Sequence, residues 1–120
     1  MAIKLVDSEL KVMNVIWRLG DCTAKQVAEI LQTEQGWNVN TTYTLIKRCI
    51  SKGAVERQEP HFQCRALLPK AEVQAAATEE FINKIYDGSA DKLFAALLGR
   101  RQLTEAQIEE LRRIVGDWQC

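Results

Sequence analysis

The spacing of apolar residues changes at Gly53, and this change constrains the fold more than any other feature of the chain. Before Gly53, apolar residues recur every three or four positions in three successive segments, as in amphipathic helices. After it, two short segments, 54–58 and 62–67, flank a turn that contains Pro60 and are typical of a β-hairpin. The sequence therefore predicts a mostly helical winged helix-turn-helix, with three helices followed by a two-stranded wing.

Residues with helix-capping side chains precede each of the three helical segments. Such a side chain accepts a hydrogen bond from a backbone N–H group that has no partner within the helix. The third segment is predicted to form a helix over about residues 40–52. The expected N-terminal caps are Asp7 or Ser8 for the first helix, Thr23 in a capping box with Gln26 for the second, and Asn40 for the third.

Helical spacing returns after residue 70, and Thr104 with Gln107 forms a capping box at the start of a last helix. The three helices expected over 71–120 are too short to enclose a core of their own. A second copy of the chain is the simplest surface against which their apolar stripes can pack. We therefore predict a winged-helix domain over 1–70 and a helical dimerisation region over 71–120. The expected dimer contacts are Phe81, Ile85, Leu93, Leu97, Leu98, Ile108, Leu111, Ile114 and Val115.

The third helix is the candidate for contacts with double-stranded DNA. In a helix-turn-helix the second helix of the motif lies in the major groove, and here this is the third helix of the chain. Its side opposite Leu45 and Cys49 carries hydroxyl and cationic side chains. Threonine can contact phosphates and the thymine methyl group, and arginine can bind guanine O6 and N7 together. The expected DNA-binding residues are Asn40, Thr41, Tyr43, Thr44, Lys47 and Arg48 on this helix, and Arg57 and Arg65 on the wing.

Net charge alone does not favour a nucleic-acid partner, since 16 Lys and Arg balance 16 Asp and Glu. The charges are not evenly spread, however: residues 1–70 carry +3 and residues 71–120 carry −3. Between residues 40 and 70, six basic residues are opposed only by Glu56 and Glu59, which leaves a local charge of +4. This local charge favours a polyanionic partner.

Several other classes of protein are disfavoured. The chain has one His and lacks the GxSxG, HExxH and glycine-rich phosphate-binding motifs, so an enzyme is not expected. The four cysteines form no CxxC pair, and His61 and Cys64 point to opposite faces of a strand, so no metal or other cofactor is expected. Cys49 is predicted to be a small buried hydrophobe and Cys120 an exposed thiol.

No apolar stretch approaches the roughly 18 residues of a membrane span. Residues 1–4 also lack the apolar run of a secretory signal. We therefore expect a cytoplasmic protein that does not bind membranes.

Residues 37–53 resemble a known family. Their pattern W-x-x-x-T-x-x-T-x-x-x-R-x-x-x-K-G is similar to the signature of the BlaI/MecI/CopY penicillinase-repressor family. Residues 8–17 match the opening helix of that family, and residues 81–89 match the start of its dimerisation region. The resemblance implies a bacterial winged-helix repressor that binds a palindromic operator as a homodimer. The recognition-helix residues that it assigns are Thr41, Thr44 and Arg48.

The resemblance also implies how repression is relieved. Family members are released by proteolysis after a membrane receptor detects β-lactam, or by copper in the CopY branch. The cysteine-rich C-terminal hook of the CopY branch is missing here, because only Cys120 stands at that end. The β-lactam branch is cleaved at an Asn-Phe bond, and the corresponding bond here is Ala96-Leu97. If a sensor protease is a partner, we expect it to cleave within 93–98.

Two other functions explain the same sequence features. The third helix of a winged-helix module can bind a protein in place of DNA, and its polar side is then an ordinary solvated helix face. A small-molecule-responsive regulator with a pocket between the last helices is the other alternative. The operator, the regulated genes and the inducing signal are not encoded in any recognisable pattern.

Overall fold

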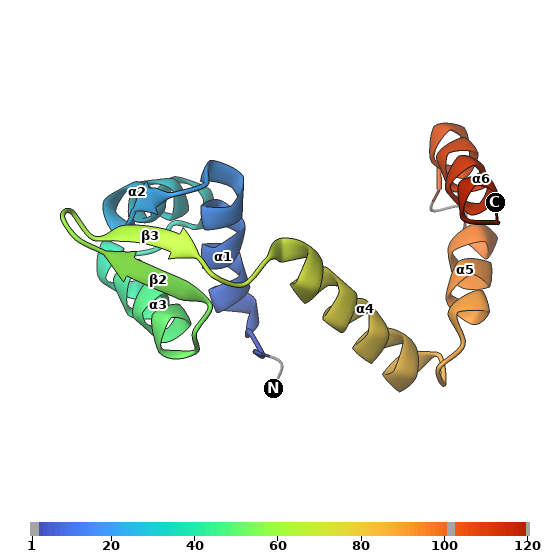
Figure 1. The fold of residues 1–120 in the computed structure, drawn as a ribbon, viewed down its shortest axis with the longest axis horizontal. Helices are drawn as coiled ribbons and strands as arrows, with labels where there is room; N and C mark the ends of the chain where they lie inside the picture. Colours follow the sequence, from blue (N-terminus) through green and yellow to red (C-terminus); the bar gives the residue numbers. More distant parts are fainter. Residues whose placement is uncertain (1–2, 101–102, 120) are drawn as a thin grey trace. The chain divides into compact units, whose positions relative to one another are not determined.

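The computed structural model describes residues 3–100 and 103–119. The chain falls into two compact units, Met1–Ala76 and Ala77–Cys120. The first unit holds three helices and a small sheet, and the described part of the second unit consists of helices (Figure 1). The predicted mostly helical fold with a winged helix-turn-helix is therefore confirmed.

The sheet of the first unit has one strand more than the sequence predicts. The elements follow one another as α1 (Asp7–Leu19), β1 (Cys22–Thr23), α2 (Ala24–Gln35), α3 (Val39–Ser51), β2 (Val55–Gln58) and β3 (Gln63–Ala66). The strands are antiparallel in the order β1-β3-β2, and β2 with β3 forms the predicted hairpin. Strand β1 escapes prediction because two residues are too few to show strand alternation.

The start of α1 differs from the prediction. The N-terminal cap is Val6, and neither Asp7 nor Ser8 takes this place, since α1 begins at Asp7. The carboxylate of Glu9 accepts a hydrogen bond from the Val6 N–H at 3.0 Å. The Glu9 carboxylate, which lies in the first helical turn, thus provides an acceptor for the Val6 N–H group. A polar capping side chain before the helix is therefore not needed.

The other two helices of the first unit begin with polar caps. The predicted capping box of α2 is confirmed: Gln26 N–H donates to Thr23 Oγ1 at 3.1 Å, and Thr23 N–H donates to Gln26 Oε1 at 2.9 Å. The prediction that Asn40 caps α3 is wrong by two residues. The cap is Asn38, whose backbone is extended and whose Oδ1 accepts from Asn40 N–H at 2.7 Å, while Asn40 itself lies in the first helical turn.

The three helices and the sheet enclose one hydrophobic core. Trp17 lies at its edge, where its indole Nε1 donates to the Leu68 carbonyl at 2.9 Å. The core fixes the buried side of α3 and thereby the direction in which its opposite side points. The buried members are Val12, Met13, Val15, Ile16, Cys22, Ala24, Val27, Leu31, Leu45, Ile46, Cys49, Ala54, Val55, Cys64 and Leu68.

The described cysteines belong to this core. Cys22, Cys49 and Cys64 are buried free thiols, which confirms the prediction for Cys49. Burial, with a smaller contribution from the nearby Glu9 charge, raises the pKa of the Cys49 thiol to about 12. The thiol is therefore neutral at pH 7 and packs as a small apolar group. Cys120 lies outside the described residues.

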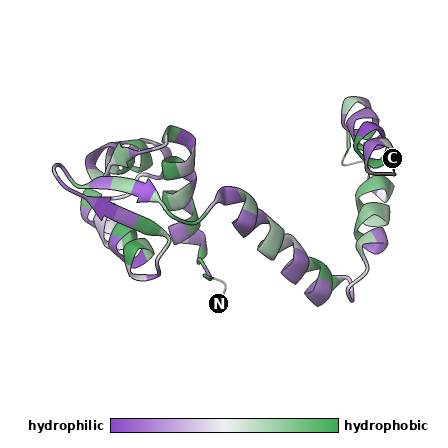
Figure 2. Cartoon of the chain, in the orientation of Figure 1, coloured by the Kyte–Doolittle hydropathy of each residue, from purple (hydrophilic) through white to green (hydrophobic). Residues whose placement is uncertain are grey.

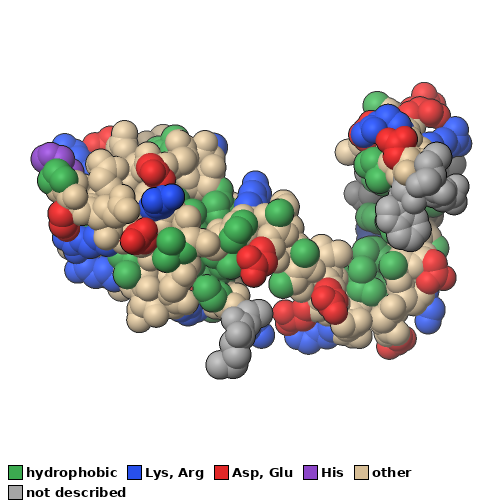
Figure 3. Space-filling view, viewed as in Figure 1, with side chains coloured by type: hydrophobic (Ala, Val, Ile, Leu, Met, Phe, Trp, Pro, Cys, Tyr) green, Lys and Arg blue, Asp and Glu red, His purple; other side chains and the backbone are tan. Residues whose placement is uncertain are grey.

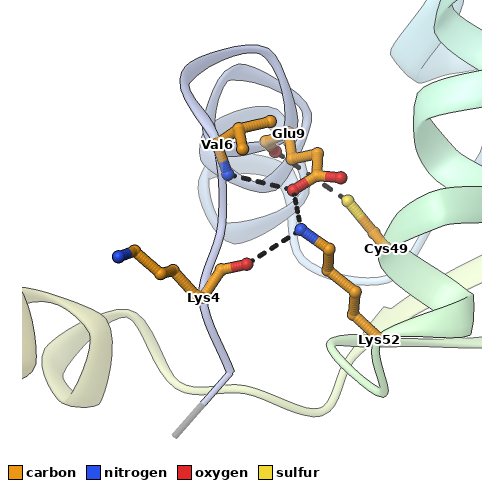
Figure 4. A network of polar contacts seen from close by, with 5 residues as sticks. All are labelled: Lys4, Val6, Glu9, Cys49 and Lys52. Atoms are coloured by element: carbon orange, nitrogen blue, oxygen red, sulfur yellow. Dashed lines mark hydrogen bonds and ion pairs between the residues drawn. The ribbon is translucent and has the colours of Figure 1, made fainter.

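An ion pair joins α1 to the end of α3 (Figure 4). The Glu9 side chain is only 2% exposed, and its Oε1 accepts from Lys52 Nζ at 2.5 Å. Lys52 Nζ also donates to the Lys4 carbonyl at 2.8 Å. Burial alone would raise the pKa of the Glu9 carboxyl, but the hydrogen bonds from Lys52 and Val6 and the nearby positive charges outweigh it, so the pKa is lowered.

We expect Glu9→Gln to lower the free energy of unfolding at pH 7 by about 1–3 kcal/mol, less than for a fully buried pair because Lys52 is partly exposed. A lowered pKa in the folded state stabilises the fold above the unfolded-state pKa, and this stabilisation is lost as pH falls through the folded-state value. The difference between Glu9→Gln and the unchanged protein should therefore shrink below about pH 4. Urea unfolding at a series of pH values from about 7 to about 3 measures this difference in the free energy of unfolding. A difference that stays constant over this range would contradict the lowered pKa of Glu9.

The described residues of the second unit form no closed core. Helix α4 (Lys70–Ile85) continues into it from the first unit, and α5 (Ala90–Gly99) and α6 (Glu105–Gln119) follow. The capping box of α6 is confirmed, with Gln107 N–H donating to Thr104 Oγ1 at 3.2 Å. None of the described side chains between residues 77 and 117 is buried. Helix α5 is nevertheless largely hydrophobic (Figure 2), and its Phe94 and Leu98 side chains are about half exposed.

Two further features concern membranes and metals. No helix in the described part of the chain is long and apolar enough to cross a bilayer. Residues 3–100 and 103–119 also contain no group of three or more His, Cys, Asp or Glu side chains that could hold a metal ion.

Candidate nucleic-acid interface

Helix α3 turns one side to the core and the other to solvent. A left-handed Gly36, with φ of 70°, ends α2, and the short turn to Asn38 then starts α3. The inner side of α3 consists of Thr42, Leu45, Ile46 and Cys49, all buried. The outer side consists of Asn40, Thr41, Thr44, Lys47 and Arg48, all exposed. The amphipathic spacing of the sequence thus places five of the six predicted α3 residues on one exposed side.

Four of these outer residues border a shallow hollow of about 290 Å³. Its lining consists of Asn40, Thr41, Thr44, Leu45 and Arg48. The Thr44 hydroxyl donates to the Asn40 carbonyl at 2.9 Å, so its oxygen remains available as an acceptor. Within the described part of the chain, Lys47 and Arg48 form no ion pair. The hollow therefore combines hydroxyl and amide groups with an unpaired guanidinium, which is the chemistry that base edges and phosphates require.

Tyr43 occupies a different position from the other predicted α3 residues. It is half-buried, and its ring meets the ring of Phe62 edge to face, with centroids 5.8 Å apart and an interplanar angle of 74°. Such aromatic contacts stabilise the packing of neighbouring elements. Tyr43 therefore joins α3 to the turn of the wing.

The two wing arginines lie on opposite faces of the hairpin. Arg57 pairs in register with Cys64, and Glu56 pairs with Arg65. Because directly opposed residues share a face and neighbouring residues alternate, Arg57 and Arg65 point in opposite directions. The sequence predicts that both arginines lie near the wing tip, but it does not predict that they lie on opposite faces. Of these two arginines, Arg57 lies on the hairpin face toward the Phe62 ring, which contacts α3, and Arg65 lies on the other face.

Arg57 is held by two contacts at the wing. Its guanidinium carbon lies 3.7 Å from the centroid of the Phe62 ring. Its Nε donates to Glu59 Oε1 at 2.6 Å, and Glu59 Oε2 accepts from the Phe62 N–H at 3.4 Å. The hydrogen bond from Arg57, followed by the one from Phe62, lowers the pKa of the Glu59 carboxyl. Figure 3 shows acidic and basic side chains together with the only histidine at this end of the first unit.

Sequence reasoning misses Phe62 and Glu59 as parts of this surface. Phe62 reads as an ordinary strand residue, and Glu59 reads only as an opposing charge. One signal does point to them: an aromatic residue and a carboxylate close to an arginine across a tight turn can enclose its guanidinium. The geometry of the turn, in which His61 and Phe62 both have positive φ values (70° and 49°), is not encoded in the apolar pattern.

The second unit has an apolar pocket of about 500 Å³ between α5 and α6. Among the predicted dimer contacts, Phe81, Ile85 and Ile114 are exposed, and Leu93 and Leu97 are half-buried outside the pocket. Sequence reasoning misses Phe94 and Leu103, although Phe94 and Leu98 are four residues apart on one helix side. The lining residues are Phe94, Leu98, Leu103, Ile108, Leu111, Arg112, Val115 and Gly116.

Comparisons with known proteins agree with this arrangement. A family model described as penicillinase repressor matches residues 5–117. The chain is 31% identical over 115 residues to the methicillin resistance regulatory protein MecI of Staphylococcus aureus (strain N315), covering 94% of each. It is 26% identical over 116 residues to the penicillinase repressor of Bacillus licheniformis, covering 95% of this chain and 91% of that protein. The solution structure of the DNA-binding domain of the repressor BlaI matches with a TM-score of 0.55 at 26% identity, covering 60% of this chain and 90% of that one.

Proposed function

Because the chain belongs to the penicillinase repressor family and is thus a DNA-binding transcriptional repressor, we propose that it binds a palindromic operator as a homodimer. Helix α3 of each copy enters the major groove, with Thr41, Thr44 and Arg48 toward the base edges. The observation that carries this proposal is the hollow on the outer side of α3, where these three side chains lie together. Arg48 reads a base or fixes the register of the helix, and the threonines contact phosphates or bases.

The wing and the remaining cations of α3 supply contacts that do not depend on sequence. Lys47 is exposed on α3, and Arg65 is exposed on the outer face of the hairpin. Both can reach phosphates of the backbone, which adds affinity for any duplex. A protein partner for α3 is the competing proposal, and it predicts no comparable affinity for DNA.

Salt dependence separates these two proposals. Phosphate contacts release counterions, so we expect the affinity of the full chain for duplex DNA to fall by roughly 10²-fold or more between 50 and 200 mM salt. Fluorescence anisotropy with a labelled random-sequence duplex measures this slope. Absence of binding at 50 mM salt would favour the protein-interaction module and exclude the repressor mechanism proposed here.

The exposed apolar surface of the second unit supports the homodimer. Phe94, Leu98 and Val115 border the apolar pocket and are about half exposed in the single chain. Phe81 and Ile85 of α4 are exposed apolar side chains outside that pocket. A small molecule would fill the pocket and leave the rest uncovered, whereas a second copy can cover both. The dimer therefore explains more of the surface than a small-molecule regulator does.

Cleavage within α5 is our proposal for the relief of repression. The bond between Ala96 and Leu97 lies in the middle of this helix, and both residues are half-buried. A protease needs an extended substrate, so α5 would have to open locally before it is cut. Cleavage there would divide the surface that joins two copies. Mass spectrometry of the chain from induced cells tests this, since intact chains under full derepression would exclude it.

A further inference from the structure

One edge of the Arg57 guanidinium on the wing is already bound to a carboxylate of the same chain. Arg57 is the cation on the hairpin face nearest α3, because the Phe62 ring on which it stacks also contacts Tyr43. The Glu59 carboxylate receives the Arg57 Nε–H at 2.6 Å and the Phe62 N–H at 3.4 Å. A carboxylate and a phosphate both present two oxygens to a guanidinium in a similar way. Glu59 therefore covers the Nε edge of the guanidinium, which is one of the edges that a DNA phosphate could bind.

This arrangement affects how much the wing adds to DNA binding. A phosphate can bind the Nε edge of Arg57 only by replacing Glu59, so at this edge the contact formed and the contact broken largely cancel. Exposed ion pairs are usually weak because their side chains are free to separate. Here Phe62 restrains both partners, since its ring lies against Arg57 and its backbone binds Glu59. The pair is thus held closed more firmly than its exposure suggests.

We propose that Glu59 partly masks Arg57 from DNA phosphates and thereby lowers the sequence-independent part of the affinity for DNA. Masking lowers the affinity for every duplex by a similar factor, and it leaves a larger share of the binding energy to the base contacts of α3. The repressor then binds every duplex more weakly, and the ratio of its operator affinity to its nonspecific affinity is unchanged. This inference rests on the proposed function, and it assigns a role in DNA binding to Glu59 of the wing.

A double-mutant cycle on full-length protein tests the masking. Glu59→Gln removes the negative charge that pairs with Arg57 and weakens their hydrogen bond, and we expect it to raise the affinity for a random-sequence duplex by about threefold to tenfold at 0.1 M salt, as one added phosphate contact would. The plot of log affinity against log salt should steepen by about one unit. Glu56→Gln is the matched control, because it removes the same charge from the residue before Arg57, which lies on the other hairpin face opposite Arg65.

The same two substitutions are then made in an Arg57→Gln background. If Glu59 acts by masking Arg57, Glu59→Gln should raise the DNA affinity no more than Glu56→Gln does in the Arg57→Gln background. If Glu59 only repels DNA through its charge, the gain is the same in both backgrounds, and the proposal is wrong. If the unchanged chain shows no salt-dependent binding to DNA, the proposed function itself fails. A chain that binds DNA but gains equally from both glutamine substitutions refutes the masking alone.

An NMR readout without DNA checks the ion pair. The Arg57 Nε–H should give a resolved signal that exchanges slowly with water, because it is hydrogen-bonded and stacked on Phe62. Glu59→Gln should accelerate this exchange severalfold, whereas Glu56→Gln should leave it unchanged. An Arg57 signal that exchanges as fast as that of Arg65 in the unchanged protein would overturn the proposal.

Discussion

Replacing Leu98 with aspartate is expected to separate the proposed homodimer into monomers and to weaken binding to the proposed operator by roughly 10²- to 10⁴-fold. Leu98 lines the apolar pocket of the second unit and is 53% exposed in the single chain. A charge there costs little in an isolated chain, but it would be buried without a partner in a dimer interface. Each half-site then binds one winged helix alone, and the advantage of linking two weak modules is lost.

Sedimentation at micromolar concentration measures the oligomeric state of the Leu98→Asp protein. Ala95→Asp is the matched control, since Ala95 lies on the same helix, is exposed and does not line the pocket. The control should remain a dimer with nearly unchanged operator affinity. A Leu98→Asp protein that sediments like the unchanged dimer would remove this surface from the interface.

Replacing Arg48 with alanine has the second largest expected effect. Arg48 is exposed at the hollow of α3 and forms no ion pair in the described part of the chain. If its guanidinium reads a base, the loss on the operator is about 1–3 kcal/mol, and the loss on random-sequence DNA is much smaller. Anisotropy titrations on both duplexes give the two losses.

Arg65→Ala provides the comparison for a phosphate contact. Arg65 lies on the outer face of the hairpin, so its loss should weaken binding to the operator and to random DNA by the same factor and flatten the salt dependence. Equal losses on the two duplexes for Arg48→Ala would reassign Arg48 to the DNA backbone. The ratio of the two losses is therefore the informative quantity.

The order of elements in the first unit follows from local patterns in the sequence. The change of apolar spacing at Gly53 predicts where helices give way to the hairpin, and the Thr23 capping box predicts the start of α2. The start of α3 is predicted two residues late, because Asn38 and Asn40 are both good caps and periodicity alone does not choose between them. Strand β1 depends on a partner far along the chain, Cys64 in β3, and has no local signal of its own.

The candidate site is predictable to the extent that it depends on one helix. Once the buried stripe of α3 is known, the opposite side must hold Thr41, Thr44 and Arg48. The wing is different, because the faces of Arg57 and Arg65 depend on the register of two strands and on the turn between them. Contacts between elements, such as that of Tyr43 with Phe62, require the folded chain.

Selection from a pool of duplexes with randomised positions tests the central claim most directly, because the protein itself picks out the operator sequence from the pool. A homodimeric repressor should enrich inverted repeats whose half-site centres are about 34–36 Å, or a multiple of this distance, apart. Sedimentation of the selected complex should then give two chains per duplex. Enrichment of a single asymmetric site that binds one chain, or no enrichment above the starting pool, would contradict the account.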